Sequence, residues 1–415
     1  MIGVGILFIA IAAIAFLGFI INALFDKLRI TDVLPLMLIG LVIGPVLGLV
    51  NVGSQSIIAE LTPYVTAIAI SFVLFDIGIN IHIDEIKDIF AKITAFTLLT
   101  QVLAGIVLAG LAFYFMKWTI IESFIFGFAV SGPSTIIVPV LARSIKVPKP
   151  LKVTLVYESV VTDIAELIVP IVLLDFMVNV NAVTATYIGS FVFTIIFGSL
   201  LLGVAFALFW LYIMNRFKEY SKGYTWILTL TMIIATYGIA QFLGLNGAIT
   251  IFIFGFSFYN IGIHKKTSQR SKSIIGRYFS ISEEVKHVRQ FQKEVVFFVS
   301  TFFFVYIGLL FSVQQASYAL IGIALLMSLI IIPLRFVFLP IIKGVLSRDK
   351  QKMKIEKYLV GFDVARGLSP AIVATLPLSM GINIPNFVDI VFIVILVTNV
   401  ISSIGIFASY KRYEK

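Results

Sequence analysis

Long apolar segments recur throughout this sequence of 415 residues, and they constrain its fold more than any other feature. The hydrocarbon core of a bilayer requires about 20 predominantly apolar residues per helix, and about thirteen segments meet that requirement. They predict an all-α polytopic membrane protein. The predicted spans are 3–24, 33–50, 62–82, 90–115, 119–142, 151–177, 184–215, 223–242, 245–260, 294–312, 316–342, 357–378 and 386–410.

The composition agrees with a membrane location and limits the chemistry. Apolar residues make up 60% of the chain and charged residues only 13%, whereas soluble domains carry about 25% charged residues. The chain has no cysteine and three histidines, which excludes disulfides, thiolate metal sites and cysteine nucleophiles. Function is therefore expected to depend on oxygen atoms and a few charges.

The positive charges predict how the chain crosses the membrane. The formal net charge is +10, and nearly all of the 31 Lys and Arg residues fall on alternate connections, with Lys117 alone on the other side. The positive-inside rule then predicts that the N-terminus lies outside and the C-terminus in the cytoplasm. We expect a multi-pass protein of the plasma membrane. The most basic connection, 261–293, is predicted to be cytoplasmic and to form a solvated helix that touches anionic headgroups, with a specific regulatory segment as the alternative. No nucleic-acid partner is needed.

The order of the spans predicts two inverted six-helix repeats, 1–177 and 223–410, joined by a connector helix at 184–215 within a single transmembrane domain. The fifth span of each repeat carries helix breakers at mid-depth. Ordinary proline kinks are the alternative, but the matched positions favour a pair of crossing, interrupted helices. The breakers are Gly132 and Pro133 in the fifth span, and Gly367 and Pro370 in the twelfth.

One face of the sixth predicted span is polar. At 100° per residue, that face gathers Glu158, Ser159, Thr162, Asp163 and Glu166. Asp163 lies roughly 18 Å from the cytoplasmic end of the span, near the midplane. A buried carboxylate that holds either a proton or a hard monovalent cation, but not both, would make an exchanger by competition.

Other charges within the spans have candidate partners. Glu158 and Arg335 both lie roughly 10 Å deep, which predicts a structural ion pair. Asp163 lies beyond the easy reach of that arginine. Asp76 and Arg366 form a weaker predicted pair, with Asp363 as a competitor, and Glu166 is either a second pathway carboxyl or simply hydrogen-bonded.

Several motifs resemble those of the monovalent cation/proton antiporter superfamily, in particular its NhaP/NHE-type branch. YESVVTD resembles the ESxxND motif of the sixth helix, and VARGLSPAI resembles the RG segment of the twelfth. Weaker apolar likenesses occur in the expected order. These are KLRITDVLPLMLIGLVIGPVLGL, LFDIGINIHIDEIK and GLNGAITIFIFGF.

This resemblance implies roles for residues at matching positions. It implies that Asp163 binds the cation or proton, and that Ser159 helps to coordinate Na⁺. It also implies that Glu158 and Arg335 form the pair beside the site, and that the unwound stretch at Ser131, Gly132 and Pro133 offers carbonyl ligands. The implied protein is a homodimeric secondary antiporter in a lipid bilayer, with no cofactor, that contributes to sodium transport and pH homeostasis.

Two positions depart from the branch and refine the expected activity. Thr162 stands where the branch usually has asparagine, and Gly132 stands where it usually has aspartate. The segment STFFFVYIGLLF also lacks the buried lysine of electrogenic relatives. We expect electroneutral exchange of one Na⁺ or Li⁺ for one H⁺ by alternating access. The alternatives are K⁺/H⁺ antiport and a channel or sensor on the same scaffold; no enzyme motif is present.

Overall fold

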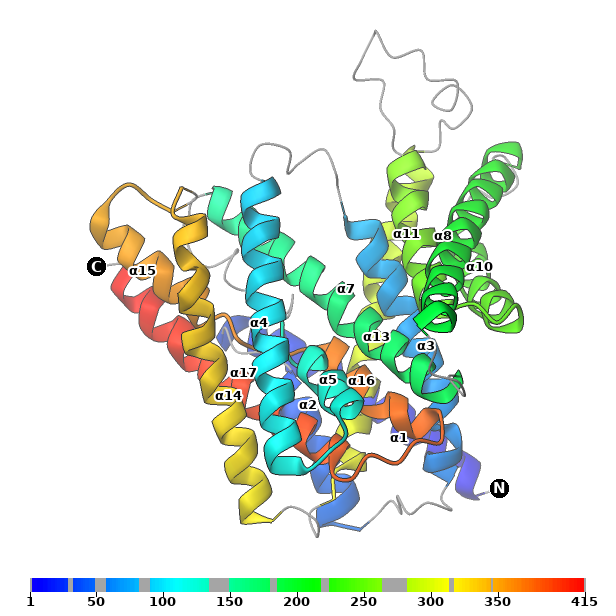
Figure 1. Cartoon of the computed structure of the whole chain (residues 1–415). Coiled ribbons are helices and arrows are strands. Elements are labelled where there is room, and N and C mark those ends of the chain that lie inside the picture. Colours follow the sequence, from blue (N-terminus) through cyan, green and yellow to red (C-terminus); the bar gives the residue numbers. More distant parts are fainter. Residues whose placement is uncertain are drawn as a thin grey trace, which may run out of the picture. The chain divides into compact units, whose positions relative to one another are not determined.

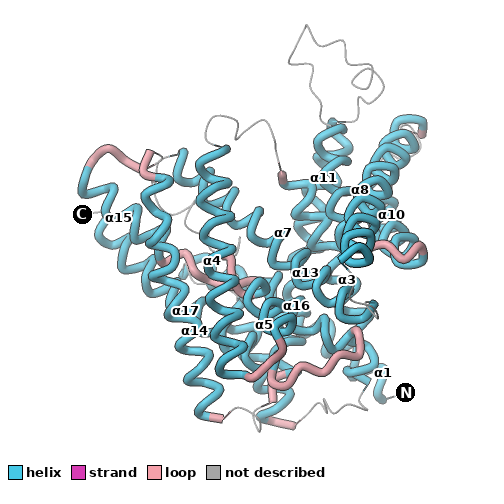
Figure 2. Tube along the Cα trace, viewed as in Figure 1, coloured by secondary structure: helices cyan, strands magenta, loops and turns pink. Residues whose placement is uncertain are grey.

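The computed structural model is helical throughout its described part, and Figure 2 shows helices joined by loops with no strand among these residues. The structure describes residues 2–28, 33–48, 57–81, 90–133, 149–179, 185–217, 224–262, 282–312, 317–344 and 346–413. Every predicted span coincides with at least one helix. The predicted all-α membrane fold is thus confirmed, whereas the count of thirteen spans and the inverted repeats stay predictions.

Seven helices in the described ranges are long and apolar enough to cross a membrane, judged by length and composition. Their spanning portions are Glu60–Asn80, Ala91–Met116, Phe193–Arg216, Thr225–Phe242, Val285–Leu310, Tyr318–Ile342 and Phe387–Ser409. Five shorter apolar helices accompany them, and both interrupted spans fall in this shorter class.

Two compact units make up the chain, and each collects segments that are far apart in the sequence (Figure 1). Unit 1 comprises residues 1–66, 86–174 and 300–415, and unit 2 comprises residues 67–85 and 175–299. These units do not coincide with the predicted repeats 1–177 and 223–410, because each unit draws its helices from both halves of the chain.

Unit 1 holds most of the helices. They are α1 (Ile2–Leu28), α2 (Val33–Leu41), the π-helical η1 (Val42–Val46), α4 (Phe90–Met116), α5 (Ile120–Ala129), α14 (Tyr318–Phe338), the 3₁₀-helical η3 (Leu339–Ile342), α15 (Lys350–Gly361), α16 (Leu368–Ser379) and α17 (Phe387–Tyr413). The unit boundary falls within α3 (Ile57–Asn80), α7 (Lys149–Asn179) and α13 (Ser282–Leu310).

Unit 2 is built on α8 (Ala185–Arg216), α10 (Thr225–Phe242) and α11 (Gly247–Gly262), which pack side by side (Figure 1). The turn into α11 is fixed by Asn246. Its side chain accepts the amide of Ile249 and donates to Asp175, at 2.9 and 2.7 Å. Cap residues of this kind satisfy the open amides at a helix start.

Within the predicted cytoplasmic connection 261–293, α13 begins at Ser282, so the last part of the connection is helical. Residues 263–281 lie outside the described part of the chain. Two polar side chains explain this start within unit 2. Gln292 donates to the carbonyl of Phe72, at 2.8 Å, and Arg289 donates to the side chain of Asn80, at 2.9 Å. These polar residues hold the first turns of α13 against the part of α3 that carries Phe72 and Asn80.

Helix caps and breaks shape the elements that carry the site. Thr119 and Glu122 form a capping box that starts α5, which then ends at Ala129. In the twelfth predicted span, α15 ends at Gly361 and α16 begins at Leu368, so residues 362–367 are not helical. Pro370 lies in the first turn of α16, where its missing amide costs no hydrogen bond. The predicted interruption of this span is therefore present.

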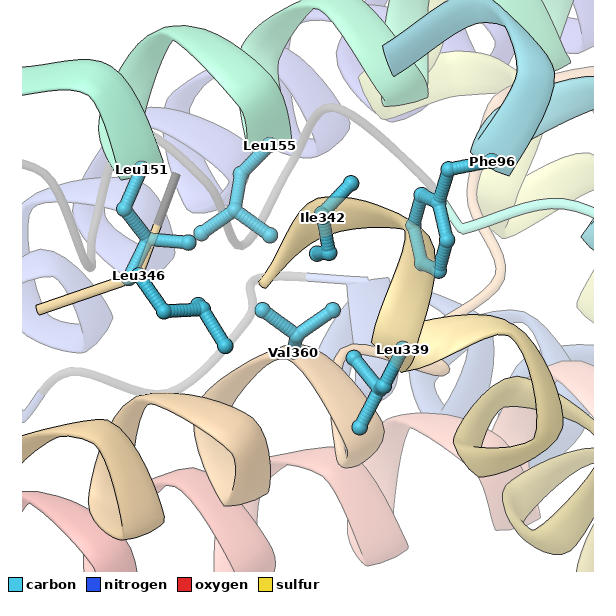
Figure 3. Close-up of a cluster of buried hydrophobic side chains, with 7 residues drawn as sticks. All are labelled: Phe96, Leu151, Leu155, Leu339, Ile342, Leu346 and Val360. Carbon is cyan, nitrogen blue, oxygen red and sulfur yellow. The ribbon is translucent and has the colours of Figure 1, made fainter. Parts of the chain in front are cut away.

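A buried apolar cluster anchors these elements in unit 1 (Figure 3). Its members come from α4, α7, η3, α15 and the residues before α15: Phe96, Leu151, Leu155, Leu339, Ile342, Leu346 and Val360. Leu155 lies one turn before Glu158, and Leu339 lies one turn after Arg335. The cluster therefore fixes the helices that present these two charges.

Candidate functional site

Asp163 lies on α7 and is 5% exposed. Ser369 donates its hydroxyl to Asp163 Oδ1, at 2.9 Å. Ser369 belongs to the first turn of α16, directly after the non-helical residues 362–367. The structure thus brings the predicted exchange residue against the interrupted twelfth span.

The other interrupted span also contacts the polar face of α7. After α5 ends, Ser131, Gly132 and Pro133 continue without helical structure and are buried. Thr162 Oγ1 lies 3.1 Å from the carbonyl oxygen of Pro133, and the amide of Gly132 donates to Glu166 Oε1 at 2.6 Å. The second half of this span, residues 134–142, lies outside the described residues.

Glu158 and Arg335 form the predicted ion pair, and the pair is bidentate. Arg335 Nη1 lies 2.7 Å from Glu158 Oε1, and Nη2 lies 3.1 Å from Oε2. Arg335 Nε also donates to the carbonyl of Val360, at 3.0 Å. Both side chains are almost completely buried. Such fork-to-fork geometry satisfies both charges and joins α7 to α14 and α15.

The hydroxyl groups of Ser159 and Thr162 are used within unit 1. Ser159 donates to the carbonyl of Val156, at 3.0 Å. Thr162 Oγ1 has three carbonyl oxygens within 3.1 Å, those of Pro133, Glu158 and Ser159, and it can donate to one at a time. A hydroxyl that donates its proton to a carbonyl keeps lone pairs for a cation. The predicted roles of Ser159 and Thr162 as ligands are compatible with these bonds and stay predictions.

A second group of charges surrounds Arg366 in the non-helical stretch before α16. Arg366 Nη2 donates to the carbonyl of Ser131, at 3.2 Å, and Glu166 and Asp363 act on its charge electrostatically. Glu166, Asp363 and Arg366 are fully buried. Neither oxygen of Asp363 has a hydrogen-bond partner among the residues described.

Asp76 belongs to unit 2, on α3. Its backbone carbonyl accepts from Asn80 Nδ2, at 2.7 Å, and Arg289 and Lys293 of α13 act on its carboxyl electrostatically. Because Arg366 belongs to the other unit, the weaker pairing of Asp76 with Arg366 stays a prediction. Within unit 1, the predicted competitor Asp363 is one of the charges that act on Arg366.

Three polar residues of the site were not predicted from the sequence. Ser369 contacts Asp163, Gln101 of α4 donates to the carbonyl of Thr162 at 3.1 Å, and Asn399 of α17 donates to the carbonyl of Arg366 at 2.7 Å. Gln101 and Asn399 are isolated amides in apolar spans, and that isolation could have identified them. Ser369 adjoins Pro370, which the sequence had already marked.

Buried carboxylates beside two interrupted membrane helices are typical of secondary transporters, where loose backbone groups and charged side chains surround an ion. Comparison with known proteins agrees. The family described as "Sodium/hydrogen exchanger, transmembrane" matches residues 11–411. The chain belongs to this family, whose members are secondary transporters that exchange Na⁺ and H⁺ without a cofactor, and it is therefore a cation/proton antiporter and not an enzyme.

Solved structures show the same fold. The sodium proton antiporter MjNhaP1 from Methanocaldococcus jannaschii at pH 8 superposes with a TM-score of 0.71 at 18% sequence identity, covering 97% of this chain and 98% of that one. An electron-microscopy structure of the same antiporter gives a TM-score of 0.65 at 19% identity, covering 100% and 94%. No curated protein matches the chain by sequence.

Proposed function

We propose that this chain exchanges one Na⁺, or one Li⁺, for one H⁺, and that the two ions compete for Asp163. The observation that carries the proposal is the position of Asp163. It is a buried carboxyl on α7, bonded to Ser369 at one interrupted span, and its helical neighbour Thr162 reaches the other interrupted span. Oxygen ligands of this kind suit a hard monovalent cation.

The division of charges in unit 1 supports competition at a single residue. Glu158 and Arg335 neutralise each other in a bidentate pair, so Glu158 is occupied structurally. The other two carboxyls, Glu166 and Asp363, interact electrostatically with the positive charge of Arg366. We propose that Asp163 binds H⁺ and Na⁺ in turn, while the neighbouring carboxyls keep their protonation state. Replacing one bound H⁺ by one Na⁺ leaves the net charge of the site unchanged.

Reconstitution into proteoliposomes tests this mechanism. An imposed Na⁺ gradient should drive proton movement in the wild type, and Asp163→Asn should abolish it. Asp389→Asn is a matched control, because Asp389 is also a buried carboxyl of unit 1, where it accepts the amide of Ser312 at 2.7 Å. Sodium-driven proton flux that survives in Asp163→Asn would refute the proposed site.

Ion choice and stoichiometry are tested in the same vesicles. We expect Na⁺ and Li⁺ to drive exchange, and K⁺ to drive little. Electroneutral exchange should proceed at the same rate with the membrane potential clamped at zero or at a negative value. A steady current in electrical recordings would instead favour a channel, and exchange driven equally by K⁺ would favour K⁺/H⁺ antiport.

We also propose that the chain has thirteen spans in two inverted repeats, with the N-terminus outside and the C-terminus in the cytoplasm. We further propose that it forms a homodimer in the plasma membrane. The one-sided distribution of Lys and Arg supports this topology. Because the chain has no cysteine, single cysteines introduced into successive connections can be labelled without background. Labelling of Lys117→Cys from the cytoplasmic side would contradict the topology.

A further inference from the structure

The carboxyl group of Glu166 on α7 accepts a hydrogen bond from the backbone of the interrupted fifth span. Its Oε1 accepts the amide of Gly132 at 2.6 Å, and the side chain is completely buried. The helix α5 has already ended at Ala129, so this amide is not part of its hydrogen-bond ladder. The amide of Gly132 and the charge of Arg366 both favour the ionised form of this carboxyl, against the effect of its burial. Glu166 thus satisfies a buried backbone donor and ties α7 to this stretch.

Gly132 cannot supply such a charge itself, because a side chain at this position has no room. A Cβ atom on Gly132 would overlap the Cβ of Thr162 and would lie 2.8 Å from its Oγ1 and 2.9 Å from its Cγ2. Thr162 in turn is held by the carbonyl oxygens around it. Any negative charge next to this stretch of chain must therefore come from a neighbouring helix, and Glu166 is in contact.

Arg366 holds the same stretch through its carbonyl side. Its Nη2 donates to Ser131 O, one residue before the amide that Glu166 accepts. Asn399 donates a hydrogen bond to the backbone carbonyl of Arg366 and so holds this residue in place. Among the carboxyls around the guanidinium group, Glu166 interacts with it most strongly. An anion on the amide and a cation on the carbonyl therefore clamp one short non-helical segment.

The clamp is adjacent to the exchange site. Asp163 and Glu166 are three residues apart on α7, so their Cβ atoms are about 5–6 Å apart, and the two carboxyls interact electrostatically. A negative Glu166 counterbalances Arg366. Without it, the guanidinium charge would act on Asp163 unopposed and would compete with a bound cation.

From these contacts we infer that Glu166 is a positioning residue for cation exchange. It holds Ser131–Pro133 in place through the Gly132 amide, and it keeps the charge of Arg366 from neutralising Asp163. This inference rests on the proposed exchange at Asp163. It assigns Glu166 to cation affinity, and it leaves the exchanged proton and cation with Asp163.

Glu356 provides a matched control for the test. It is also fully buried in unit 1, and its Oε2 accepts the amide of Ser347 at 2.6 Å. Its other oxygen, like that of Glu166, has no hydrogen-bond partner among the residues described. The two glutamates therefore make the same kind of bond, but only Glu166 contacts the interrupted fifth span and lies one turn from Asp163.

The experiment measures Na⁺-driven proton flux in proteoliposomes for Glu166→Gln and Glu356→Gln, with the wild type and Asp163→Asn alongside. For Glu166→Gln, the Na⁺ concentration at half-maximal rate should rise at least about tenfold, because a unit charge about 5–6 Å away at an effective dielectric constant near 20 has an effect of up to about a hundredfold. The maximal rate should change less, and Glu356→Gln should stay within about twofold of the wild type.

The outcomes separate this inference from the proposed function. If Asp163→Asn abolishes flux but Glu166→Gln keeps the wild-type Na⁺ dependence, the role of Glu166 is refuted and exchange at Asp163 stands. If Asp163→Asn retains flux, the proposed function fails first. Should Glu166→Gln not fold, Glu166→Asp keeps the charge but shortens the reach to Gly132; a wild-type Na⁺ dependence in that variant would overturn the inference.

Discussion

Two groups of charge lie along α7 and differ in how completely they are hydrogen-bonded. In the first, both oxygens of Glu158 meet Arg335, whose Nε is also bonded to Val360. In the second, around Asp163, one oxygen of Glu166 and two nitrogens of Arg366 have no partner among the residues described. Complete bonding resists rearrangement. In the second group the unpartnered Glu166 oxygen is an acceptor, whereas the Arg366 nitrogens are donors that add positive charge beside it. The comparison suggests that the first group holds the helices and the second exchanges ions.

The largest effect is expected from a substitution that breaks the fully hydrogen-bonded group, the Glu158–Arg335 pair. Arg335→Ala leaves the Glu158 charge buried and unpaired, so it should lower the free energy of unfolding by about 3–5 kcal/mol. Thermal unfolding in detergent should show a large drop in the apparent melting temperature, whereas exposed Arg348→Ala should change it little. The double variant Glu158→Leu with Arg335→Met should recover part of the loss. Wild-type stability in Arg335→Ala would contradict a structural role for the pair.

A smaller effect is expected where the incomplete group meets the interrupted fifth span. Gly132→Ala places a methyl group against Thr162, and overpacking of this kind costs about 1–3 kcal/mol. Exchange in proteoliposomes should fall sharply, because the Gly132 amide and the Pro133 carbonyl that contact Glu166 and Thr162 are displaced. Gly322→Ala, with open space around it, is the control. Thr162→Gly in the same chain as Gly132→Ala should restore part of the activity; undiminished exchange in Gly132→Ala alone would show that the close packing is unimportant.

A still smaller effect is expected from a single hydroxyl at the incomplete group. Ser369→Ala removes the donor to Asp163, and one such bond is worth about 1 kcal/mol. The Na⁺ concentration at half-maximal exchange should shift by about fivefold. Ser328→Ala removes a buried hydroxyl that bonds only within α14 and should leave it unchanged. If both variants showed the same Na⁺ dependence, the proposed contribution of Ser369 to cation binding would be refuted.

The smallest effect concerns stability and pH at Glu356, a carboxyl that belongs to neither group. Burial raises the pKa of Glu356, and the amide of Ser347 and the charge of Lys352 oppose this only partly. Because the folded state holds this proton more tightly than the unfolded state, the contribution of Glu356 to stability is present below its ordinary pKa and is lost as the pH rises through the folded value. The apparent melting temperature of Glu356→Gln should therefore depend less on pH above about 4.5 than that of the wild type. Exposed Glu60→Gln should keep the wild-type slope, and an unchanged slope in Glu356→Gln would refute this assignment.

The sequence predicts the complete group better than the incomplete one. Equal depth in two apolar spans was enough to pair Glu158 with Arg335, because two opposite charges buried at one level have few other partners. The Asp163 neighbourhood depends on where non-helical backbone passes, and hydropathy does not encode that path. Ser369, Gln101 and Asn399 are not predicted from the sequence for this reason.

The central claim is competition between one cation and one proton for Asp163. Calorimetric titration of the purified protein with Na⁺, in buffers with different ionisation enthalpies, measures how many protons leave as Na⁺ binds. The account predicts about half a proton released per Na⁺ bound at the midpoint of the proton's own titration, rising toward one proton per Na⁺ at lower pH, and no Na⁺-linked release in Asp163→Asn. Sodium binding without proton release, or the same release from Asp163→Asn, would contradict it.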